Sequence, residues 1–203
     1  ILKRMISNND IFKVVHNDLH PQPGRLLISE PFLRDAYFQR SVVLLVEHSG
    51  DTGSMGFILN KKTELTINML FPELEHLPET PIYLGGPVAS NRLFFVHSLG
   101  NAVIPNSFPI NDHLYFDGDF DALRDYMLSE HNFADKVKFF IGYSGWGKGQ
   151  LKDEIKANSW AVGHSDDQRV FEDAGEAFWK YTVVNLGEQY KPWIQFPKDP
   201  FLN

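Results

Sequence analysis

The chain has 203 residues, 43% of them hydrophobic, which is enough apolar material to build one large domain around a shared core. A formal net charge of -7, with lysine and arginine scattered singly, disfavours direct binding to nucleic acid phosphates. The absence of cysteine excludes disulfides, thiolate nucleophiles and Cys-ligated zinc, and it is typical of a protein of the reducing cytosol.

Two sequence features bear on where the protein resides. The longest apolar run, Val42 to Val46, is far shorter than the ~20 residues that span a bilayer. Charged residues interrupt the hydrophobic N-terminus too early for the core of a signal peptide. We therefore expect a soluble, cytoplasmic protein in which residues 1–23 form an N-terminal arm and residues 24–203 form a single domain.

Strands dominate the first half of the predicted domain. Apolar segments at Arg25–Ser29, Ser41–His48 and Gly56–Asn60 have strand character, and the short Gly/Asp connection at 49–55 predicts an antiparallel hairpin between the last two. Because Val42 to Val46 is apolar without interruption, both faces of that strand should be covered.

A second group of strands follows. Pro81–Gly85 and Leu93–His97 flank Gly85-Gly86-Pro87, where glycine freedom and the fixed φ of proline predict a hairpin or a tight corner. His113–Phe116 is expected to add one more strand.

Helices enter in the second half. Phe120, Leu123 and Met127 lie at helical spacing after Asp119, which can cap a helix over 119–131. The elements expected next are strand Val137–Ile141, helix Gln150–Asn158, strand Trp160–Val162, helical segments within Asp167–Leu186 and a surface tail at Pro192–Asn203. The inward stripe of the last helical region is expected to contain Val170, Ala174, Ala177, Phe178 and Tyr181. This order of elements favours a mixed sheet in an α+β or α/β arrangement.

The most informative segment is 137–151, where an apolar strand meets four closely spaced glycines before a helix. Glycine leaves no Cβ between main chain and neighbour, so the segment should bind a ligand, turn tightly or pack closely on another element. A P-loop would need Ser or Thr where Gly149 stands, and a nucleophile elbow around Ser144 would need glycine at Trp146. The glycine spacing also departs from the dinucleotide-binding motif. Ligand binding and close packing therefore remain open.

Histidines and carboxylates suggest acid-base chemistry at two strand ends, in Glu47-His48 and in His97-Ser98. Neighbours on a strand point to opposite faces, so neither adjacent pair forms a dyad without a partner elsewhere. A hydrogen-bonded residue at a polar rim is the more frequent role of such a histidine. The sequence has no spacing typical of a metal site, and we expect no metal and no cofactor.

Polar residues should meet at the open end of the first hairpin. Antiparallel pairing returns Asn60 to the place where Arg40 and Ser41 begin their strand, and Arg92 could add a second cation. The alternative is that Arg40 pairs with Asp35 or Glu30 and only fixes the preceding loop.

Four sequence blocks together resemble the bacterial YqgE/AlgH family: Gly24–His48, Gly56–Asn60, Tyr83–Val88 with Arg92–Ser98, and Gly142–Leu151. The blocks run in the family's order and spacing. Ser144 and Lys148 depart from its usual residues, so no family chemistry is assigned to them.

The resemblance implies a bent, branched and mostly antiparallel sheet that curls into a partial barrel with helices packed outside. We therefore expect an α+β fold. The family's label of transcriptional regulator refers to a genetic effect, and the sequence has no helix-turn-helix signature or basic recognition helix.

These observations predict a domain that binds a small molecule or a protein partner in one cleft and has an indirect regulatory role. Candidate ligand-binding residues are Arg40, Ser41, Asn60, Gly85, Gly86, Pro87, Arg92, Tyr143, Gly145, Trp146, Gly147 and Gln150; Glu47, His48, His97 and Ser98 could form a polar rim. Arg40 would hold an anionic group and Trp146 would stack on the ligand. Two alternatives are a hydrolase that uses His48 or His97 with a serine from another strand, and a DNA-binding regulator, which the acidic charge disfavours.

Overall fold

The computed structural model describes residues 19–129, 132–173 and 175–198, so most of the predicted arm at 1–23 and the end of the predicted tail lie outside the described residues. The strands are β1 Arg25–Ser29, β2 Val42–Ser49, β3 Gly53–Ile58, β4 Lys62–Thr66, β5 Pro81–Leu84, β6 Val88–His97, β7 Phe108–Pro109, β8 Tyr115–Phe116, β9 Val137–Trp146 and β10 Trp160–His164. The α-helices are α1 Ile67–Leu70, α2 Phe120–Ser129, α3 Gln150–Lys156 and α4 Gly175–Asn185; the 3-10 helices are η1 Pro72–Leu74, η2 Arg169–Phe171 and η3 Glu188–Gln195.

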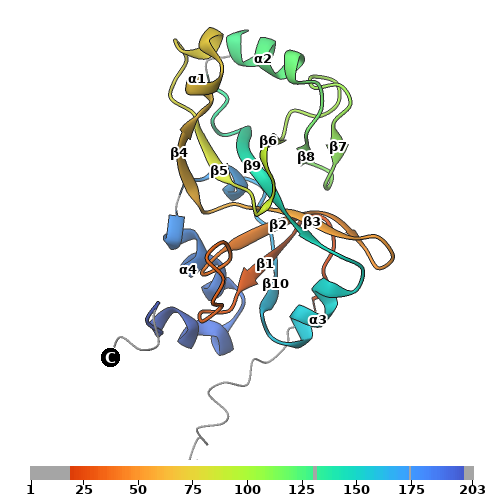
Figure 1. The fold of residues 1–203 in the computed structure, drawn as a ribbon, viewed down its shortest axis with the longest axis vertical. Coiled ribbons are helices and arrows are strands. Elements are labelled where there is room, and N and C mark those ends of the chain that lie inside the picture. Colours follow the sequence, from red (N-terminus) through yellow and green to blue (C-terminus); the bar gives the residue numbers. More distant parts are fainter. Residues whose placement is uncertain (1–18, 130–131, 174, 199–203) are drawn as a thin grey trace, which may run out of the picture.

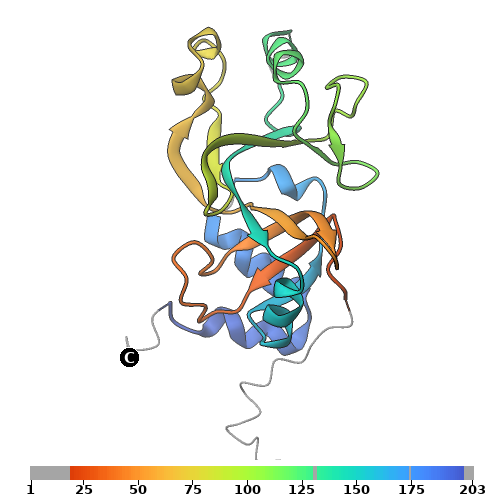
Figure 2. The same ribbon diagram turned by 45° about the vertical axis from the view of Figure 1, so that its right-hand side comes forward.

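The ten strands form one branched sheet with the order β10-β1-β2-β3-β9-β6-β8-β7. The branch lies on β9, which pairs with β6 along one edge and with β5 and then β3 along the other. Only the pairing of β5 with β9 is parallel among the described strands. In Figures 1 and 2, β9 runs from the part that holds α1 and α2 to the part that holds α3 and α4, so it joins the two halves of the fold.

Strand β2 is covered on both faces, as its sequence predicted. Val42 and Leu44 pack in a cluster with Trp179 of α4, whereas Val43 and Leu45 pack in another cluster with Leu151 of α3. Each cluster removes a row of β-branched and leucine side chains from water, so α4 and α3 hold the sheet from opposite sides.

The glycine-rich segment is largely strand rather than loop. β9 continues through Trp146, and its last residues pair with Ser54 to Gly56 of β3. At Gly142, which has φ of +69°, an added Cβ would lie 2.5 Å from the carbonyl oxygen of Gly86. An added Cβ on Gly86 would lie 2.4 Å from the backbone nitrogen of Ser144. The glycines at this crossing therefore allow two main-chain segments to pack closely.

The corner at Gly85-Gly86-Pro87 does not close a hairpin. β5 and β6 both pair with β9, which lies between them, so the corner carries the chain across β9. The sequence could not indicate this insertion because β9 lies far along the chain. It also missed β4, whose side chains are mostly exposed, and overestimated the strand at 113–116, of which only Tyr115–Phe116 pair.

Helix α2 begins as the sequence predicted, since Asp119 accepts a hydrogen bond from the Ala122 amide at 3.1 Å. The inward stripe of the last helix differs from the prediction. Trp179 and Val183 are buried, whereas Tyr181 is 37% exposed. The helical region is split into η2 and α4, so the residues before the break do not set the helical phase after it. Ala174, also assigned to that stripe, lies outside the described residues.

The α+β class expected from the sequence is confirmed, with a large, mostly antiparallel sheet that does not close into a barrel. Within the described residues no helix is both long and apolar enough to cross a membrane.

Candidate functional site

The predicted candidate residues do not line one cleft. Arg40, Ser41 and Asn60 do meet, as the hairpin geometry predicted: the Asn60 amide donates to the Arg40 carbonyl at 3.0 Å and accepts from the Val42 amide at 2.9 Å. They lie at the beginning of β2, whereas Tyr143 to Trp146 lie beside its other end.

Arg40 is committed to internal partners. Its guanidinium donates to the Glu176 carboxylate at 2.6 Å and to the Phe196 carbonyl at 2.6 Å, and the residue is 7% exposed. Its carboxylate partner is thus on α4 rather than Asp35 or Glu30. Burial would raise the pKa of Glu176, but hydrogen bonds from Lys198 and Arg40 outweigh it and lower that pKa. The arrangement ties the hairpin to the C-terminal segment.

A shallow hollow of about 640 Å³ lies at the other end of β2, and we call it the β9 hollow. It is lined by Glu47, His48, Ser49, Thr52, Gly53, Ser54, Met55, Val88, Tyr143, Gly145 and Trp146. His48 of β2 stands opposite Ser54 of β3, with His48 Nδ1 2.7 Å from Ser54 Oγ. Within the described chain, no carboxylate bonds to the other ring nitrogen of His48.

Trp146 forms part of the wall of this hollow but has little free surface. The residue is 5% exposed, its Nε1 donates to Glu154 at 2.9 Å, and its ring packs edge to face on Trp160. Gln150 is likewise occupied, accepting from the Gly147 amide and donating to Glu154. These bonds fix the start of α3.

His97 is fully buried and makes hydrogen bonds within the core. Burial lowers the pKa of His97 to about 4 against the opposing hydrogen bond to the Asp117 carbonyl, so the ring is neutral at pH 7. Its Nδ1 accepts from the Leu99 amide, which places the ring proton on Nε2, 2.9 Å from Ser107 Oγ. Ser107 Oγ in turn donates to the Ile104 carbonyl at 2.7 Å, so His97 cannot act as its base.

The remaining candidates have separate positions. Arg92 pairs with Asp117 at 3.3 Å, and the Ser98 amide donates to the Lys136 carbonyl at 3.0 Å. Gly85 and Gly86 belong to the crossing with β9, where Ser144 Oγ donates to the Gly85 carbonyl at 2.9 Å, and Pro87 follows them at the corner. None of these residues lines the β9 hollow.

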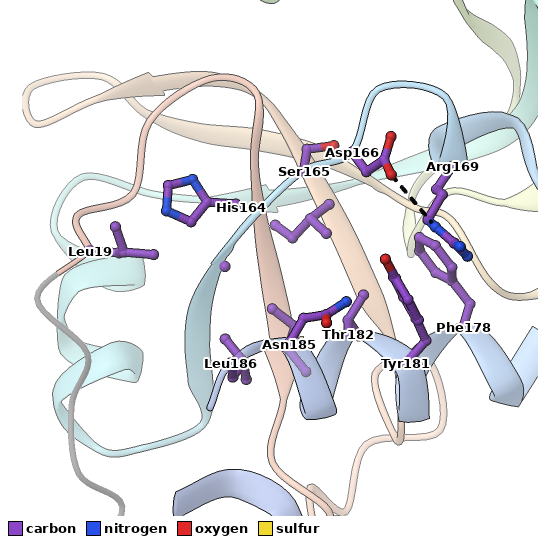
Figure 3. Close-up of a pocket in the computed structure, with 13 residues that line it drawn as sticks. Leu19, His164, Ser165, Asp166, Arg169, Phe178, Tyr181, Thr182, Asn185 and Leu186 are labelled. Carbon is purple, nitrogen blue, oxygen red and sulfur yellow. Dashed lines mark ion pairs between the residues drawn. The ribbon is translucent and has the colours of Figure 1, made fainter. Parts of the chain in front are cut away.

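A more enclosed cavity of about 350 Å³, the α4 pocket, lies between α4 and the outer strands β1 and β10 (Figure 3). Its lining residues are Leu19, Leu26, Ile28, Gly163, His164, Ser165, Asp166, Arg169, Phe178, Tyr181, Thr182, Asn185 and Leu186. The two strands contribute an apolar floor, in which Gly163 lies close to Ile28: an added Cβ would be 2.8 Å from Ile28 Cδ1.

Polar groups surround this apolar floor. Ser165 Oγ is buried and has no hydrogen-bond partner within the described residues. Tyr181 and Asn185 project from α4 toward the pocket, and neither side chain makes a hydrogen bond within the described part of the chain (Figure 3). Arg169 stacks over the Tyr181 ring at 4.0 Å and pairs with Asp166 and Glu172. The pocket thus combines apolar surface with several unused hydrogen-bonding groups.

Sequence reasoning missed this pocket because it assigned Tyr181 to the inward stripe of its helix. The available signal was Gly163-His164-Ser165-Asp166, a polar run with glycine directly after the apolar residues of β10.

The pocket combines an apolar floor with polar and charged side chains around it, a combination found in small-molecule sites. In the described parts of the chain, no cluster of three or more histidine, aspartate or glutamate side chains could hold a metal ion.

Comparisons with known proteins agree with the observed fold. The chain is 59% identical to a UPF0301 protein of Parabacteroides distasonis, over 98% of this chain and 100% of that protein. A UPF0301 protein of Bacteroides fragilis is 42% identical, over 97% and 98% of the two chains.

Two solved structures are similar. A crystal structure of a Corynebacterium diphtheriae protein has a TM-score of 0.75 at 21% identity, with 95% of this chain and 100% of that chain covered. The solution structure of the AlgH protein from Pseudomonas aeruginosa has a TM-score of 0.67 at 25% identity, with 86% and 94% covered. The AlgH-like family matches residues 26–191. The chain therefore belongs to the AlgH-like family.

Proposed function

We propose that this protein binds a small amphiphilic molecule in the α4 pocket. The observation that carries the proposal is the coincidence of a partly enclosed cavity with polar side chains that have no hydrogen-bond partner among the described residues. Ser165 Oγ is buried and has no hydrogen-bond partner among the described residues, and the exposed side chains of Tyr181 and Asn185 make no hydrogen bond there either. A buried hydroxyl without a partner costs about 1–3 kcal/mol, and a bound ligand would recover that cost.

The chemistry of the walls selects the ligand class. Leu26, Ile28 and Phe178 offer apolar surface to a hydrocarbon or aromatic body, and the polar groups suit one uncharged head with both donors and acceptors. Arg169 already faces two carboxylates, so it supplies little free charge for an anion. A volume of about 350 Å³ suits a compact metabolite rather than a lipid chain of full length.

We further propose that the role is an indirect regulatory one in the cytoplasm, exerted through a protein partner whose binding depends on the ligand. The net charge of -7 supports a protein partner over direct contact with DNA. The α4 pocket opens beside Leu19, where the described chain begins, so an occupied pocket would present a different surface there.

Thermal-shift screening with a library of small amphiphiles tests the binding function. We expect stabilisation by at least one compound, and we expect Asn185→Ala with Tyr181→Phe to weaken that stabilisation at least about tenfold in concentration. Val184→Ala is the matched control because Val184 is an exposed residue of the same helix that does not line the pocket. An unchanged response in the double variant, or no stabilising compound at all, would reject the α4 pocket.

A second candidate function is hydrolysis at the β9 hollow, and the His48–Ser54 pair is the observation that favours it. With Nδ1 and Oγ 2.7 Å apart, the imidazole could take the serine proton as Oγ attacks an ester or amide carbonyl. Removing a proton this way is usually assisted by a carboxylate on the other ring nitrogen, which the described residues do not supply.

A fluorophosphonate probe separates this alternative from simple binding. An active Ser54 would be labelled, and Ser54→Ala would abolish the label while Ser49→Ala, in the same hollow, would retain it. Equal and negligible labelling of wild type, Ser54→Ala and Ser49→Ala would rule out hydrolysis at the β9 hollow.

A further inference from the structure

A different cavity, of about 360 Å³, lies beside β5 and β9 and contains a buried lysine. Its lining includes Lys138, Tyr83 and Asp173 together with the apolar side chains of Pro78, Phe133 and Phe171. We call it the Lys138 cavity. It shares no lining residue with the α4 pocket, so the inference drawn from it is independent of the proposed function.

Lys138 has an unusual set of contacts for a buried cation. The residue is 4% exposed, and its Nζ donates to the Glu172 carbonyl at 2.7 Å. The same nitrogen lies 3.9 Å from the centroid of the Tyr83 ring, whose π face attracts a cation. No salt bridge within the described residues joins it to a carboxylate. Lysines at such depth are rare unless they are paired, so the position calls for a chemical explanation.

Charged groups approach this nitrogen from several elements. Asp173 is the nearest source of negative charge, but it pairs with Lys62 of β4 at 2.9 Å and accepts a hydrogen bond from the Tyr83 hydroxyl. The carboxylate of Glu172 pairs with Arg169, and Glu79 lines another part of the cavity. The attraction of Asp173 for Lys138 is therefore shared with other partners.

The buried environment favours the neutral form of the Lys138 amine. Burial lowers the pKa of Lys138 to about 7, although the charges of Asp173 and Glu172 oppose the shift. Burial, and then the hydrogen bond and the charge of Asp173, raise the pKa of Tyr83, so its hydroxyl keeps its proton. At neutral pH a substantial share of Lys138 is the free amine, whereas an exposed lysine is almost wholly protonated.

We propose that Lys138 binds a small aldehyde or ketone in this cavity as a Schiff base. The lone pair of Nζ attacks the carbonyl carbon, and the new C–N bond gives a carbinolamine. The two amine protons leave with the carbonyl oxygen as one molecule of water, which leaves a C=N bond. One proton from solvent then gives the iminium, and no oxidant or reductant takes part. An iminium at the position of Lys138 Nζ would lie over the Tyr83 ring with the Asp173 carboxylate at the same cavity, and both would stabilise its positive charge.

Reductive trapping tests this assignment on the wild-type chain. Propanal and sodium cyanoborohydride are added at pH 7, and the modified lysines are identified by peptide mass spectrometry. We expect the initial rate at Lys138 to exceed that at Lys152 of α3, an exposed lysine that serves as an internal control, by about tenfold or more because of its larger free-amine fraction. A rate at Lys138 equal to or below that at Lys152 would overturn the proposal.

One variant tests whether the aldehyde enters through the cavity. Ala134 is an exposed lining residue, so Ala134→Trp should narrow the opening without changing Lys138 itself. We expect labelling of Lys138 to fall at least about fivefold while Lys152 reacts as before. Unchanged labelling of Lys138 would show that the reagent reaches it by another route and would refute the cavity as the binding site.

Discussion

Helix α4 uses its polar groups differently on two faces. On one side, Glu176 pairs with Arg40 and Trp179 Nε1 donates to the Ser29 carbonyl at 3.0 Å. Toward the α4 pocket, Tyr181 and Asn185 make no hydrogen bond within the described chain. The comparison teaches that polar groups bonded within the protein stabilise the fold, whereas the exposed side chains of Tyr181 and Asn185 keep their hydrogen-bonding groups for water or a ligand.

Lys138 extends this comparison to the two buried cations of the described chain. Arg40 has a carboxylate at 2.6 Å, while Lys138 has a carbonyl and an aromatic ring in place of one. A buried charge without its own counter-ion tends to shift its pKa and to become neutral. We therefore assign Arg40 to stability and Lys138 to chemistry.

The largest effect is expected for Arg40→Met. The change removes two charge-assisted hydrogen bonds, one to the Phe196 carbonyl and one to Glu176, so the unfolding free energy should fall by about 3 kcal/mol. Lys198→Met is the matched control, because Lys198 contacts the same carboxylate from an exposed position and should cost under about 1 kcal/mol. Urea unfolding measures both, and equal losses would contradict the structural role of Arg40.

The next effect concerns pH and Lys138. The folded pKa of about 7 lies below the unfolded value, so between these values the unfolded chain binds more protons and stability rises with pH. The free-energy cost of burying the charged Lys138 amine is fully present below pH 7 and decreases as the pH rises. We expect wild type to gain about 2 kcal/mol relative to Lys138→Met between pH 7 and pH 9 in urea unfolding. A difference that is constant with pH would contradict the lowered pKa.

A smaller effect of the same sign is expected from His97. The folded pKa of His97, about 4, is also lowered from its usual value of 6.5. Between these two pH values the unfolded chain binds a proton at His97 and the folded chain does not, so stability falls as the pH falls. From pH 6.5 to pH 5, wild type should lose about 1.5 kcal/mol more than His97→Gln. Parallel stability curves of the two proteins over this range would show that His97 binds a proton in the fold.

The smallest effect on stability is expected in the α4 pocket. Tyr181→Phe and Asn185→Ala remove exposed groups that make no hydrogen bond to any described residue, so each should change unfolding free energy by under about 0.5 kcal/mol. A loss above about 2 kcal/mol in either variant would place these residues among the structural partners of α4 and remove the contrast between its faces.

Local patterns in the sequence predicted much of the fold. The apolar run Val42 to Val46 predicted a strand covered on both faces, and Asp119 predicted the start of α2. The glycines of 137–151 predicted a close approach of backbone, but could not identify Gly86 as the neighbour, because that contact joins segments far apart in the chain.

The sites were harder to predict for the same reason. Arg40 and Asn60 were correctly placed together by hairpin geometry, yet the carboxylate that occupies Arg40 comes from α4. Tyr181 was assigned to the wrong face of its helix, since the break before α4 changes the helical phase. Lys138 follows Val137 in an apolar strand, and the sequence alone does not indicate the cavity beside it.

The most direct test of the binding account is an NMR titration of the isotope-labelled protein with the best amphiphile from the thermal-shift screen. We predict saturable shifts concentrated on Gly163, Ser165, Tyr181 and Asn185, with the Arg40 junction and the β9 hollow unchanged. Shifts concentrated on His48, Ser54 and Tyr143 instead would contradict the account and move the site to the β9 hollow.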